Sequence, residues 1–248
     1  MKIAIIGYGK MGKVIEKLAL AQGHEVILRI SRNNLSELNQ KSIVQVNVAI
    51  EFTSPETAVQ NISFCLENNV PVVSGTTGWL DKMDEIRAQC STYKGAFFYA
   101  SNFSIGVNIF FAMNRLLSSL MKDKFQYDVL VDEIHHTQKQ DYPSGTAITL
   151  SEDIIARSGR KHTWKGVLKG KDEEVKEDDI LQITSQRIGV VPGTHHVKWV
   201  SAIDEIEISH VAHSREGFAA GALSAAEWII GKQGCFGMDD MLGFVKEV

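Results

Sequence analysis

Three glycines near the N-terminus constrain the fold of this 248-residue chain more than any other feature. Ile3 to Ile6 is an unbroken apolar run, typical of a parallel strand that is buried on both faces. Gly7, Gly9 and Gly12 come directly after it, and the apolar residues that follow recur at helical spacing. A strand, a glycine turn and a helix in this order predict the first unit of a dinucleotide-binding sheet, with a purely structural tight turn as the alternative.

The glycine turn assigns a separate task to each of its glycines. Gly7 permits the tight turn, Gly9 lets the backbone approach a pyrophosphate, and Gly12 lets the helix pack closely on the strand. The free N–H groups and the dipole at the helix start attract the phosphates. The predicted phosphate loop consists of Gly7, Tyr8, Gly9, Lys10, Met11 and Gly12.

The end of the second predicted strand, Glu25 to Ile30, indicates which nucleotide is bound. A site that prefers NAD places a carboxylate there for the ribose hydroxyls, whereas this chain continues with Ser31 and Arg32. Arginine and serine suit a 2′-phosphate, so NADPH is favoured over NADH. Arg32 is a better candidate than Arg29 because it lies beyond the strand end. In the alternative interpretation both arginines are solvated surface charges.

Strands and helices keep alternating up to about residue 105. The predicted strands are Val48–Phe52, Pro71–Val73 and Ala96–Tyr99, and the predicted helices are Pro55–Glu67 and Asp81–Cys90. Loops at the carboxyl ends of such strands line the ligand crevice. We therefore expect Thr76 and Thr77, in the loop Ser74–Gly78, to hydrogen-bond a nicotinamide or a substrate, and the Asn102 amide, in the loop Ala100–Ser104, to bind a carboxamide. A plain turn, and an Asn102 amide that only braces its loop, are the alternatives.

The pattern changes after Gly106 and predicts a second domain of α+β type. A long apolar helix is expected at Val107–Met121, and a final helix at Arg215–Ile230 is expected to return to the first domain. Strand-like segments are Tyr127–Ile134, Ile180–Val191, His195–Ala202 and Glu205–Ala212, the last three expected to be successive antiparallel strands, and Lys169–Asp179 is predicted to be an exposed loop. The predicted class is α/β. A Rossmann dinucleotide-binding domain (1–105 and 217–248) is expected to surround an inserted α+β domain (106–216) with a mixed or antiparallel sheet.

The segment from Glu133 to Ala147 concentrates residues that carry chemistry. His135 and His136 can hold or release a proton near neutral pH, and Lys139 offers a positive charge or a proton. Adjacent histidines on a strand point to opposite faces, and catalysis, metal binding and a structural pair are all compatible with the pattern. A helix start with N–H groups suited to an anionic substrate is predicted at Ser144, Gly145 and Thr146. The histidines expected to be structural or interface residues are His195, His196, His210 and His213.

The overall composition excludes several classes of function. The chain has 26 Lys and Arg residues against 30 Asp and Glu residues and no basic tract, which argues against a nucleic-acid surface. Its three cysteines show no metal-binding spacing, so we expect a reduced, cytoplasmic protein without a metal site. No apolar run approaches the roughly 20 residues of a membrane helix. Small molecules are the expected partners.

Several motifs together resemble one family. The run from Glu133 to Ala147 is similar to the signature of the dihydrodipicolinate reductases, more fully the 4-hydroxy-tetrahydrodipicolinate reductases of bacterial lysine and diaminopimelate biosynthesis. The glycine loop, Gly75–Gly78, Ser101–Asn108 and His213–Ala222 also resemble family segments, so the likeness covers nearly the whole chain.

The resemblance implies a function for most of these residues. His135 would be the proton donor or acceptor, and Lys139 a second proton donor. The residues that would bind the substrate carboxylates are His136, Ser144, Gly145 and Thr146. The cofactor would be held by Gly7–Gly12, Gly75–Thr77 and Ala100–Phe103. The family also implies a homotetramer whose second domain supplies the subunit contacts, and movement of the domains about a hinge.

The implied reaction is the reduction of a dicarboxylate ring, (hydroxy-)dihydrodipicolinate, to tetrahydrodipicolinate by NADPH. Two features depart from some relatives: the glycine loop is one residue shorter, and the acidic residue after the second strand is missing. The second departure favours NADPH, although family members often accept NADH as well. The alternatives are an NADPH-sensing protein of the same fold without turnover, and another two-domain Rossmann dehydrogenase.

Overall fold

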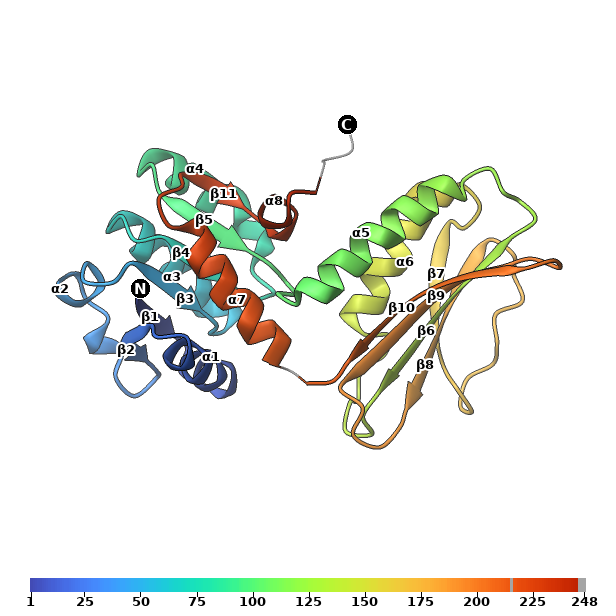
Figure 1. Cartoon of the computed structure of the whole chain (residues 1–248), viewed down its shortest axis with the longest axis horizontal. Helices are drawn as coiled ribbons and strands as arrows, with labels where there is room; N and C mark the ends of the chain where they lie inside the picture. The colour runs from blue at the N-terminus through green and yellow to red at the C-terminus, as the bar shows by residue number, and fades with distance from the viewer. Residues whose placement is uncertain (215, 245–248) are drawn as a thin grey trace. The chain divides into compact units, whose positions relative to one another are not determined.

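The computed structural model describes residues 1–214 and 216–244 and divides into two compact units. The first unit is formed by Met1–Ile105 and Glu216–Val248, and the second by Gly106–Arg215. The second unit is therefore inserted into the sequence of the first (Figure 1). Each unit has a sheet and a core of its own, which confirms the α/β class.

The first unit contains a parallel sheet of six strands in the order β11-β5-β4-β3-β1-β2. Its strands are β1 (Lys2–Ile6), β2 (Glu25–Ile30), β3 (Val48–Glu51), β4 (Val72–Ser74), β5 (Ala96–Tyr99) and β11 (Gly234–Phe236). The short apolar runs of the sequence form its centre because both faces of these strands are covered by helices.

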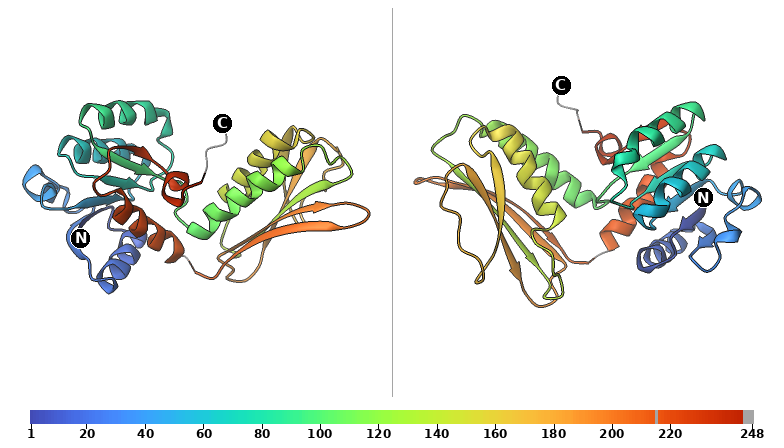
Figure 2. Two further views of the ribbon diagram at one scale, coloured as in Figure 1. Left: turned by 45° about the horizontal axis from the view of Figure 1, so that its top comes forward. Right: turned by 180° about the vertical axis from the view of Figure 1, so that it is seen from behind.

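Alternate residues of each strand in this sheet enter one of two cores. Ile3 and Ile5 pack in one core with residues of α1 (Lys10–Ala21) and α7 (Glu216–Ile229), whereas Ala4 and Ile6 pack in the other with residues of α3 (Pro55–Glu67) and α4 (Met83–Thr92). Figure 2 shows these helices on the two faces of the sheet. The helices of the unit are α1 (Lys10–Ala21), α2 (Gln40–Ile43), α3 (Pro55–Glu67), α4 (Met83–Thr92), α7 (Glu216–Ile229) and α8 (Met238–Leu242), with 3-10 helices at Leu35–Glu37 and Leu80–Lys82.

The second unit contains a mixed sheet of five strands in the order β10-β9-β6-β8-β7. The strands are β6 (Asp128–His135), β7 (Thr163–Leu168), β8 (Ile180–Arg187), β9 (Gly193–Val200) and β10 (Glu205–Ala212). Helices α5 (Ile105–Leu120) and α6 (Gly145–Ser158) share a core with one face of this sheet, through residues such as Phe110, Leu150 and Val131.

One strand direction and several short elements differ from the sequence predictions. The segment from Ile180 was expected to continue as an antiparallel strand, but β8 pairs in parallel with both β6 and β7. That prediction was wrong because strand partners are chosen by tertiary packing, which side-chain alternation does not record. Sequence analysis also missed β7, β11, α2 and α8, whose length or mixed composition leaves no clear period.

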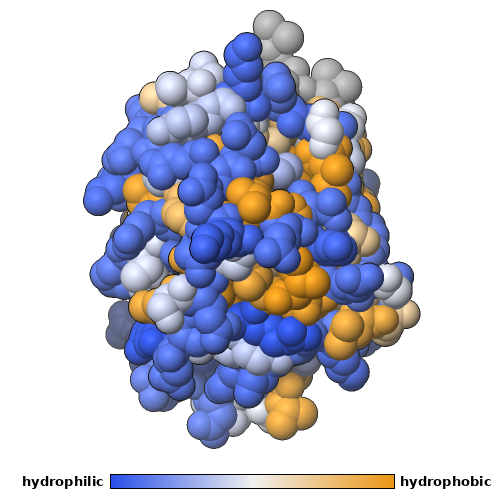
Figure 3. All heavy atoms as spheres, turned by 90° about the vertical axis from the view of Figure 1, so that its left-hand side faces the viewer, coloured by the Kyte–Doolittle hydropathy of each residue, from blue (hydrophilic) through white to orange (hydrophobic). Residues whose placement is uncertain are grey.

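Polar side chains dominate the face of the molecule drawn in Figure 3, with hydrophobic residues in small patches among them. Among the residues that the structure describes, we find no helix with both the length and the apolar character needed to cross a membrane.

Candidate functional site

The glycine turn lies beside a cavity of about 850 Å³ in the first unit. The lining includes Gly7, Tyr8 and Gly9, together with residues from the ends of β2 and β3 and from α3. Gly7 has a φ of 101°, and a Cβ at this position would come within 1.9 Å of the Phe52 carbonyl oxygen. Only glycine fits the turn that the sequence predicted here.

The other two glycines have different surroundings. A Cβ on Gly12 would lie 2.6 Å from the Gly7 carbonyl oxygen, so this glycine is required for close packing of α1 on the turn. A Cβ on Gly9 would meet no atom within 4 Å. Gly9 is also the N-cap of α1, which has no side-chain cap among the described residues. An open approach to uncapped N–H groups at a helix start fits the pyrophosphate of a dinucleotide.

The two arginines near the end of β2 have different partners. Arg32 lines the cavity together with Ser31. Arg29 instead forms an ion pair with Glu16, whose carboxylate also accepts a hydrogen bond from the Tyr8 hydroxyl. Of these two cations, Arg32 is therefore the one that lines the cavity.

The loop after β4 is fastened by a buried carboxylate. Glu51, at the end of β3, accepts hydrogen bonds from the Thr76 hydroxyl at 2.9 Å and the Ser74 hydroxyl at 2.6 Å. The Thr76 hydroxyl in turn accepts the Thr53 N–H at 2.8 Å. The predicted cofactor residue Thr76 thus uses its side chain inside the protein, while Thr77 is exposed. Glu51 was not identified from the sequence.

The loop after β5 is tied to the core of the first unit. Phe103 is 2% exposed and packs against Phe52 and Phe98, so its ring is a core residue. The side-chain oxygen of Asn102 accepts a hydrogen bond from the Ser104 N–H at 2.9 Å, which braces the loop. Ser101 is exposed and Ala100 is buried. The side chains of this loop therefore act mainly in packing and bracing.

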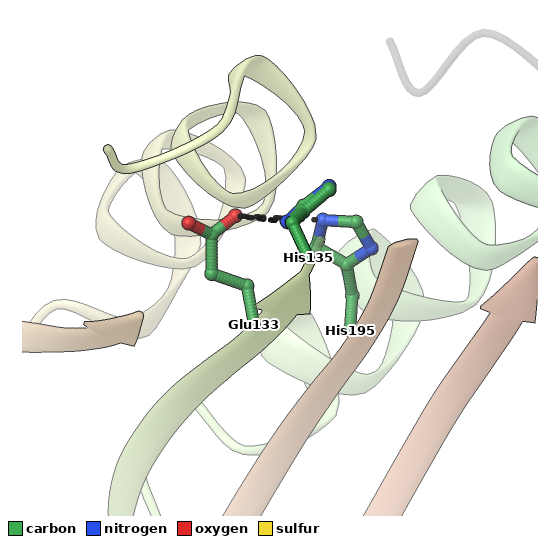
Figure 4. Close-up of side chains that lie close together, drawn as sticks. All are labelled: Glu133, His135 and His195. Carbon is green, nitrogen blue, oxygen red and sulfur yellow. Dashed lines mark ion pairs between the residues drawn. The ribbon is translucent and has the colours of Figure 1, made fainter. Parts of the chain in front are cut away.

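A cluster of polar groups lies on the otherwise apolar face of the second sheet. Along β6 the buried residues are Val129, Val131, Glu133 and His135, so the core face becomes polar toward the end of the strand. Glu133 lies opposite Ser185 of β8 on one side and His195 of β9 on the other. Figure 4 shows Glu133, His135 and His195 gathered at this end of the sheet.

Glu133 is the centre of this cluster. Its carboxylate accepts the Ser185 hydroxyl at 2.7 Å and the Ser144 N–H at 3.1 Å, and Arg187 lies 3.3 Å away. Burial acts to raise the pKa of Glu133, but the polar contacts of His135, Ser144 and Ser185 outweigh it, so its pKa lies well below the ordinary carboxylate range. Glu133 is therefore a buried anion at neutral pH.

The two buried histidines meet this anion in different ways. His135 Nδ1 lies 3.4 Å from one carboxylate oxygen of Glu133, and His195 Nε2 lies 3.8 Å from the same oxygen. His195 Nε2 is also 3.0 Å from the Ser144 hydroxyl. Burial and the neighbouring His135 lower the pKa of His195 to about 3, so His195 is neutral under ordinary conditions.

Sequence analysis did not anticipate His195 in this site, nor a role for Glu133, Ser185 and Arg187. His195 was expected to be structural or at an interface, and the structure places it in the cluster through its register with Glu133. One signal was present in the sequence: Glu133 occupies a position of β6 where alternation requires a buried residue. The partner strands could not be found without the sheet pairing.

Lys139 and His136 belong to the turn that follows β6. Lys139 donates its N–H to the His136 carbonyl oxygen at 3.1 Å and pairs through its ammonium group with Asp141, which lowers the pKa of that carboxyl. Arg187 donates to the carbonyl oxygens of Lys139 at 3.1 Å and Asp141 at 2.8 Å. Arg187 thereby holds this turn against the sheet. His136 is partly exposed.

A helix begins where the sequence predicted one, at the start of α6. Ser144 is the N-cap, and its hydroxyl accepts the Ala147 N–H at 3.3 Å. The N–H groups of Gly145 and Thr146 belong to the first helical turn, where no intrahelical acceptor exists. A Cβ on Gly145 would meet no atom within 4 Å, so the helix start is accessible to a ligand. Arg215, the first residue of the predicted final helix, lies outside the described residues.

Glu133, His135 and His195 also have ligand atoms within 4.8 Å of one another, a spacing that a metal ion could use. The carboxylate already accepts three hydrogen bonds, and one of them comes from the Arg187 guanidinium at 3.3 Å. A positive group so close offsets the charge that would attract a metal cation. The arrangement therefore disfavours a metal ion at this cluster.

Comparison with known proteins gives matches over both units. Residues 1–103 match the family model described as "Dihydrodipicolinate reductase, N-terminus", and residues 106–242 match "Dihydrodipicolinate reductase, C-terminus". The chain is 43% identical over 242 residues to the 4-hydroxy-tetrahydrodipicolinate reductase of Christiangramia forsetii, covering 98% of each chain. It is 36% identical over 201 residues to that of Methanoregula boonei, covering 81% of this chain and 76% of the relative.

Solved structures show the same fold. The dipicolinate-bound dihydrodipicolinate reductase from Paenisporosarcina sp. TG-14 is 21% identical, with a TM-score of 0.79 over 97% of this chain and 98% of the other. A diaminopimelate dehydrogenase of C. glutamicum is 13% identical, with a TM-score of 0.54 over 99% and 96%. The family matches extend over nearly the whole sequence and confirm the resemblance seen in its motifs. The chain belongs to the dihydrodipicolinate reductase family.

Proposed function

We propose that this chain is a 4-hydroxy-tetrahydrodipicolinate reductase that uses NADPH. The observation that carries the proposal is the buried cluster of Glu133 and His135 beside the open start of α6, in a chain of this family. Such a site combines a proton-holding group with an anion-binding helix start. The choice of substrate is supported by the names of two relatives, the 4-hydroxy-tetrahydrodipicolinate reductases of Christiangramia forsetii and Methanoregula boonei.

The substrate would bind through its two carboxylates. One carboxylate would accept the N–H groups of Gly145 and Thr146 at the start of α6, with Ser144 as the cap of that helix. His136, on the turn after β6, would contribute a further contact. These groups act locally, through N–H donors and the positive end of the α6 dipole, so they can bind a dianion although the chain carries a net charge of −4.

The nicotinamide, when bound, supplies a hydride to the electrophilic ring carbon. Hydride addition leaves negative charge on the ring system, and a proton must neutralise it. His135 or Lys139 would donate that proton, which gives tetrahydrodipicolinate. The 4-hydroxyl leaves as water before the hydride arrives, because its loss creates the conjugated imine that makes the ring carbon electrophilic. Asp141, which pairs with the Lys139 ammonium, holds that side chain in place in the absence of substrate.

The cofactor residues in the proposal are those of the glycine turn and of the two strand-end loops. Gly7–Gly12 would hold the pyrophosphate, Arg32 the 2′-phosphate, and the backbones of Gly75–Thr77 and Ala100–Phe103 the nicotinamide end. The cavity with its open Gly9 is the structural support for this placement. NADH would be accepted more weakly, because no carboxylate follows β2 to receive the ribose hydroxyls.

The proposal also covers the domain organisation of the chain, its assembly and its location in the cell. Residues 1–105 and 217–248 would form the cofactor domain, and residues 106–216 the domain for substrate binding and for contacts within a homotetramer. The cytoplasm is proposed as the location because Cys65, Cys90 and Cys235 are free thiols, as is usual in a reducing compartment.

Oxidation of NADPH in the presence of freshly generated dihydrodipicolinate tests the function. We expect cofactor consumption that falls by about 100-fold or more in His135→Ala and in Lys139→Ala, with NADPH binding retained. Lys169→Ala, which changes an exposed lysine of the 169–179 loop, is the control and should match the wild type. Absence of turnover in folded, NADPH-binding protein would refute the proposal and favour the sensing protein.

A further inference from the structure

We propose that Glu133 is a positioning residue that fixes the tautomer of His135. Its carboxylate holds the proton on Nδ1 of the neutral imidazole, which leaves Nε2 as the nitrogen that takes up and delivers the transferred proton. The inference rests on the proposed function only in the step that gives His135 a proton to transfer. The tautomer itself is a property of the free protein.

The geometry around His135 supports this assignment. Nδ1 is 3.4 Å from a Glu133 oxygen, and within the described residues no group completes a hydrogen bond with this buried nitrogen. The carboxylate is the anion that faces it, so a proton on Nδ1 is stabilised by charge. A contact of this length is typical of a site that tightens only when its ligand binds.

The opposite nitrogen faces a different environment. Nε2 lies next to Gly193, where a Cβ would approach to 3.1 Å. Gly193 thus leaves room beside the nitrogen that would exchange a proton. A residue with a side chain at this position would crowd the imidazole ring.

Glu133 itself is held firmly enough to act as a reference point. The Ser185 hydroxyl donates to one oxygen at 2.7 Å, and Arg187 lies 3.3 Å from that same oxygen. The other oxygen faces His135 and accepts the Ser144 N–H at 3.1 Å. One oxygen is therefore anchored by β8, and the other connects His135 with the start of α6. A fully buried carboxylate with these partners has little freedom to rotate.

This connection joins the two halves of the proposed chemistry. Ser144 caps the helix whose first N–H groups would bind a substrate carboxylate. The same Glu133 oxygen contacts the Ser144 backbone and His135. The Glu133 side chain therefore fixes the position of His135 relative to the start of α6. From β9, the neutral His195 contacts the Ser144 hydroxyl and completes the cluster.

Nitrogen-15 NMR of the imidazole rings tests the tautomer without any substrate. The His135 signals are assigned by their loss in His135→Gln. In the wild-type protein, at a pH where His135 is neutral, we expect Nδ1 to carry the proton and Nε2 to be unprotonated. The reverse tautomer in the wild type overturns the proposal. This measurement needs no variant of Glu133, so it stands even if such a variant fails to fold.

Kinetics of Glu133→Gln provide the second test. Glutamine retains an oxygen for the Ser144 N–H but removes the charge that faces His135. We expect kcat to fall by about 100-fold with little change in the KM of either substrate, and the Nδ1–H tautomer to be lost. Asp132→Asn is the matched control: it removes one negative charge from the adjacent position of β6, whose side chain points to the opposite face.

The results of these experiments distinguish a failure of the tautomer proposal from a failure of the proposed reductase function. Asp132→Asn should remain within about two-fold of the wild type in kcat, as a change outside the site should. A folded Glu133→Gln protein with wild-type kcat and tautomer overturns the inference while the reductase function stands. A wild type that has the expected tautomer but no turnover refutes the function alone.

Discussion

His195 and Glu133 lie side by side in the second unit as a neutral imidazole and a buried anion. Burial lowers the pKa of His195 to about 3, against an ordinary value of 6.5. The pKa of Glu133 is also lowered, from an ordinary value of 4.5, because its polar contacts outweigh the effect of burial. Both groups take up protons more readily in the unfolded chain than in the fold, so both make stability fall as the pH decreases.

The free energy of unfolding should therefore decrease in two stages on acidification. Between pH 6.5 and 4.5 the unfolded chain protonates His195 while the folded chain does not, and below pH 4.5 Glu133 adds to the loss. We expect His195 to account for roughly 2 kcal/mol across the first window. His210, whose pKa is also lowered by burial, contributes a slope in the same direction.

Denaturant unfolding of the wild type and of His195→Gln at several pH values measures this effect. Glutamine retains a polar group near the Ser144 hydroxyl but does not titrate, so the variant should show a flatter profile between pH 6.5 and 4.5. Equal slopes in the two proteins would mean that His195 is not held neutral by the fold.

We expect the nucleotide preference to depend on Arg32. It lines the cavity beside the glycine turn, whereas Arg29 is paired with Glu16. In Arg32→Ala we expect the KM for NADPH to rise by about 10-fold or more and the KM for NADH to change little, because only NADPH has a 2′-phosphate. Arg29→Ala is the control, and an equal effect of both substitutions on both cofactors would contradict the assignment.

At the scale of elements, helix α7 packs closely against the loop after β5 because Gly221 has no side chain. A Cβ on Gly221 would come within 1.7 Å of the Phe103 carbonyl oxygen, whereas a Cβ on Gly217 would meet nothing closer than the Ser104 hydroxyl at 3.8 Å. Both glycines belong to the same helix, so alanine brings the same gain in helix propensity at each. Only Gly221 is required by packing.

The two alanine substitutions should therefore have opposite effects. Gly221→Ala is expected to destabilise the protein by about 2–4 kcal/mol, since backbone has to move to admit the methyl group. Gly217→Ala should be neutral or stabilising by up to about 1 kcal/mol. Thermal or denaturant unfolding distinguishes them, and similar values for both would show that α7 does not approach the loop so closely.

Most helices and strands could be predicted from the sequence where the period of apolar residues or a turn residue was clear. The order of β1, the glycine turn and α1 follows from apolar runs and glycine positions, and the structure has them at Lys2–Ile6 and Lys10–Ala21. The parallel pairing of β8 was not predictable, because alternation shows which face of a strand is buried but not which strand lies beside it.

The residues of the candidate site also fall into those that the sequence could identify and those that it could not. His135, Lys139 and the helix start at Ser144 lie within one short segment and could be identified together. His195, Ser185 and Arg187 are 50 or so residues further along the chain, and only the pairing of β6 with β8 and β9 brings them to Glu133. Thr76 and Phe103 were expected at the cofactor, yet their side chains are used in a carboxylate network and in the core.

At the scale of the whole molecule, the expected assembly is a homotetramer. Light scattering coupled to size-exclusion chromatography should give about four times the 27.5 kDa mass of one chain. The expected contacts come from the second unit, so the mass should not depend on added NADPH. A mass equal to one chain at micromolar concentration would contradict the prediction.

The sequence by itself determined the class of fold, the family and the chemistry-bearing segment from Glu133 to Ala147. Those properties depend on local order: glycine spacing, apolar period and neighbouring residue types. The tertiary structure decided that Glu133 is the centre of the site, with His195, Ser185 and Arg187 around it. The physical reason is that a buried charge must be satisfied by partners, and those partners come from adjacent strands that are distant in sequence.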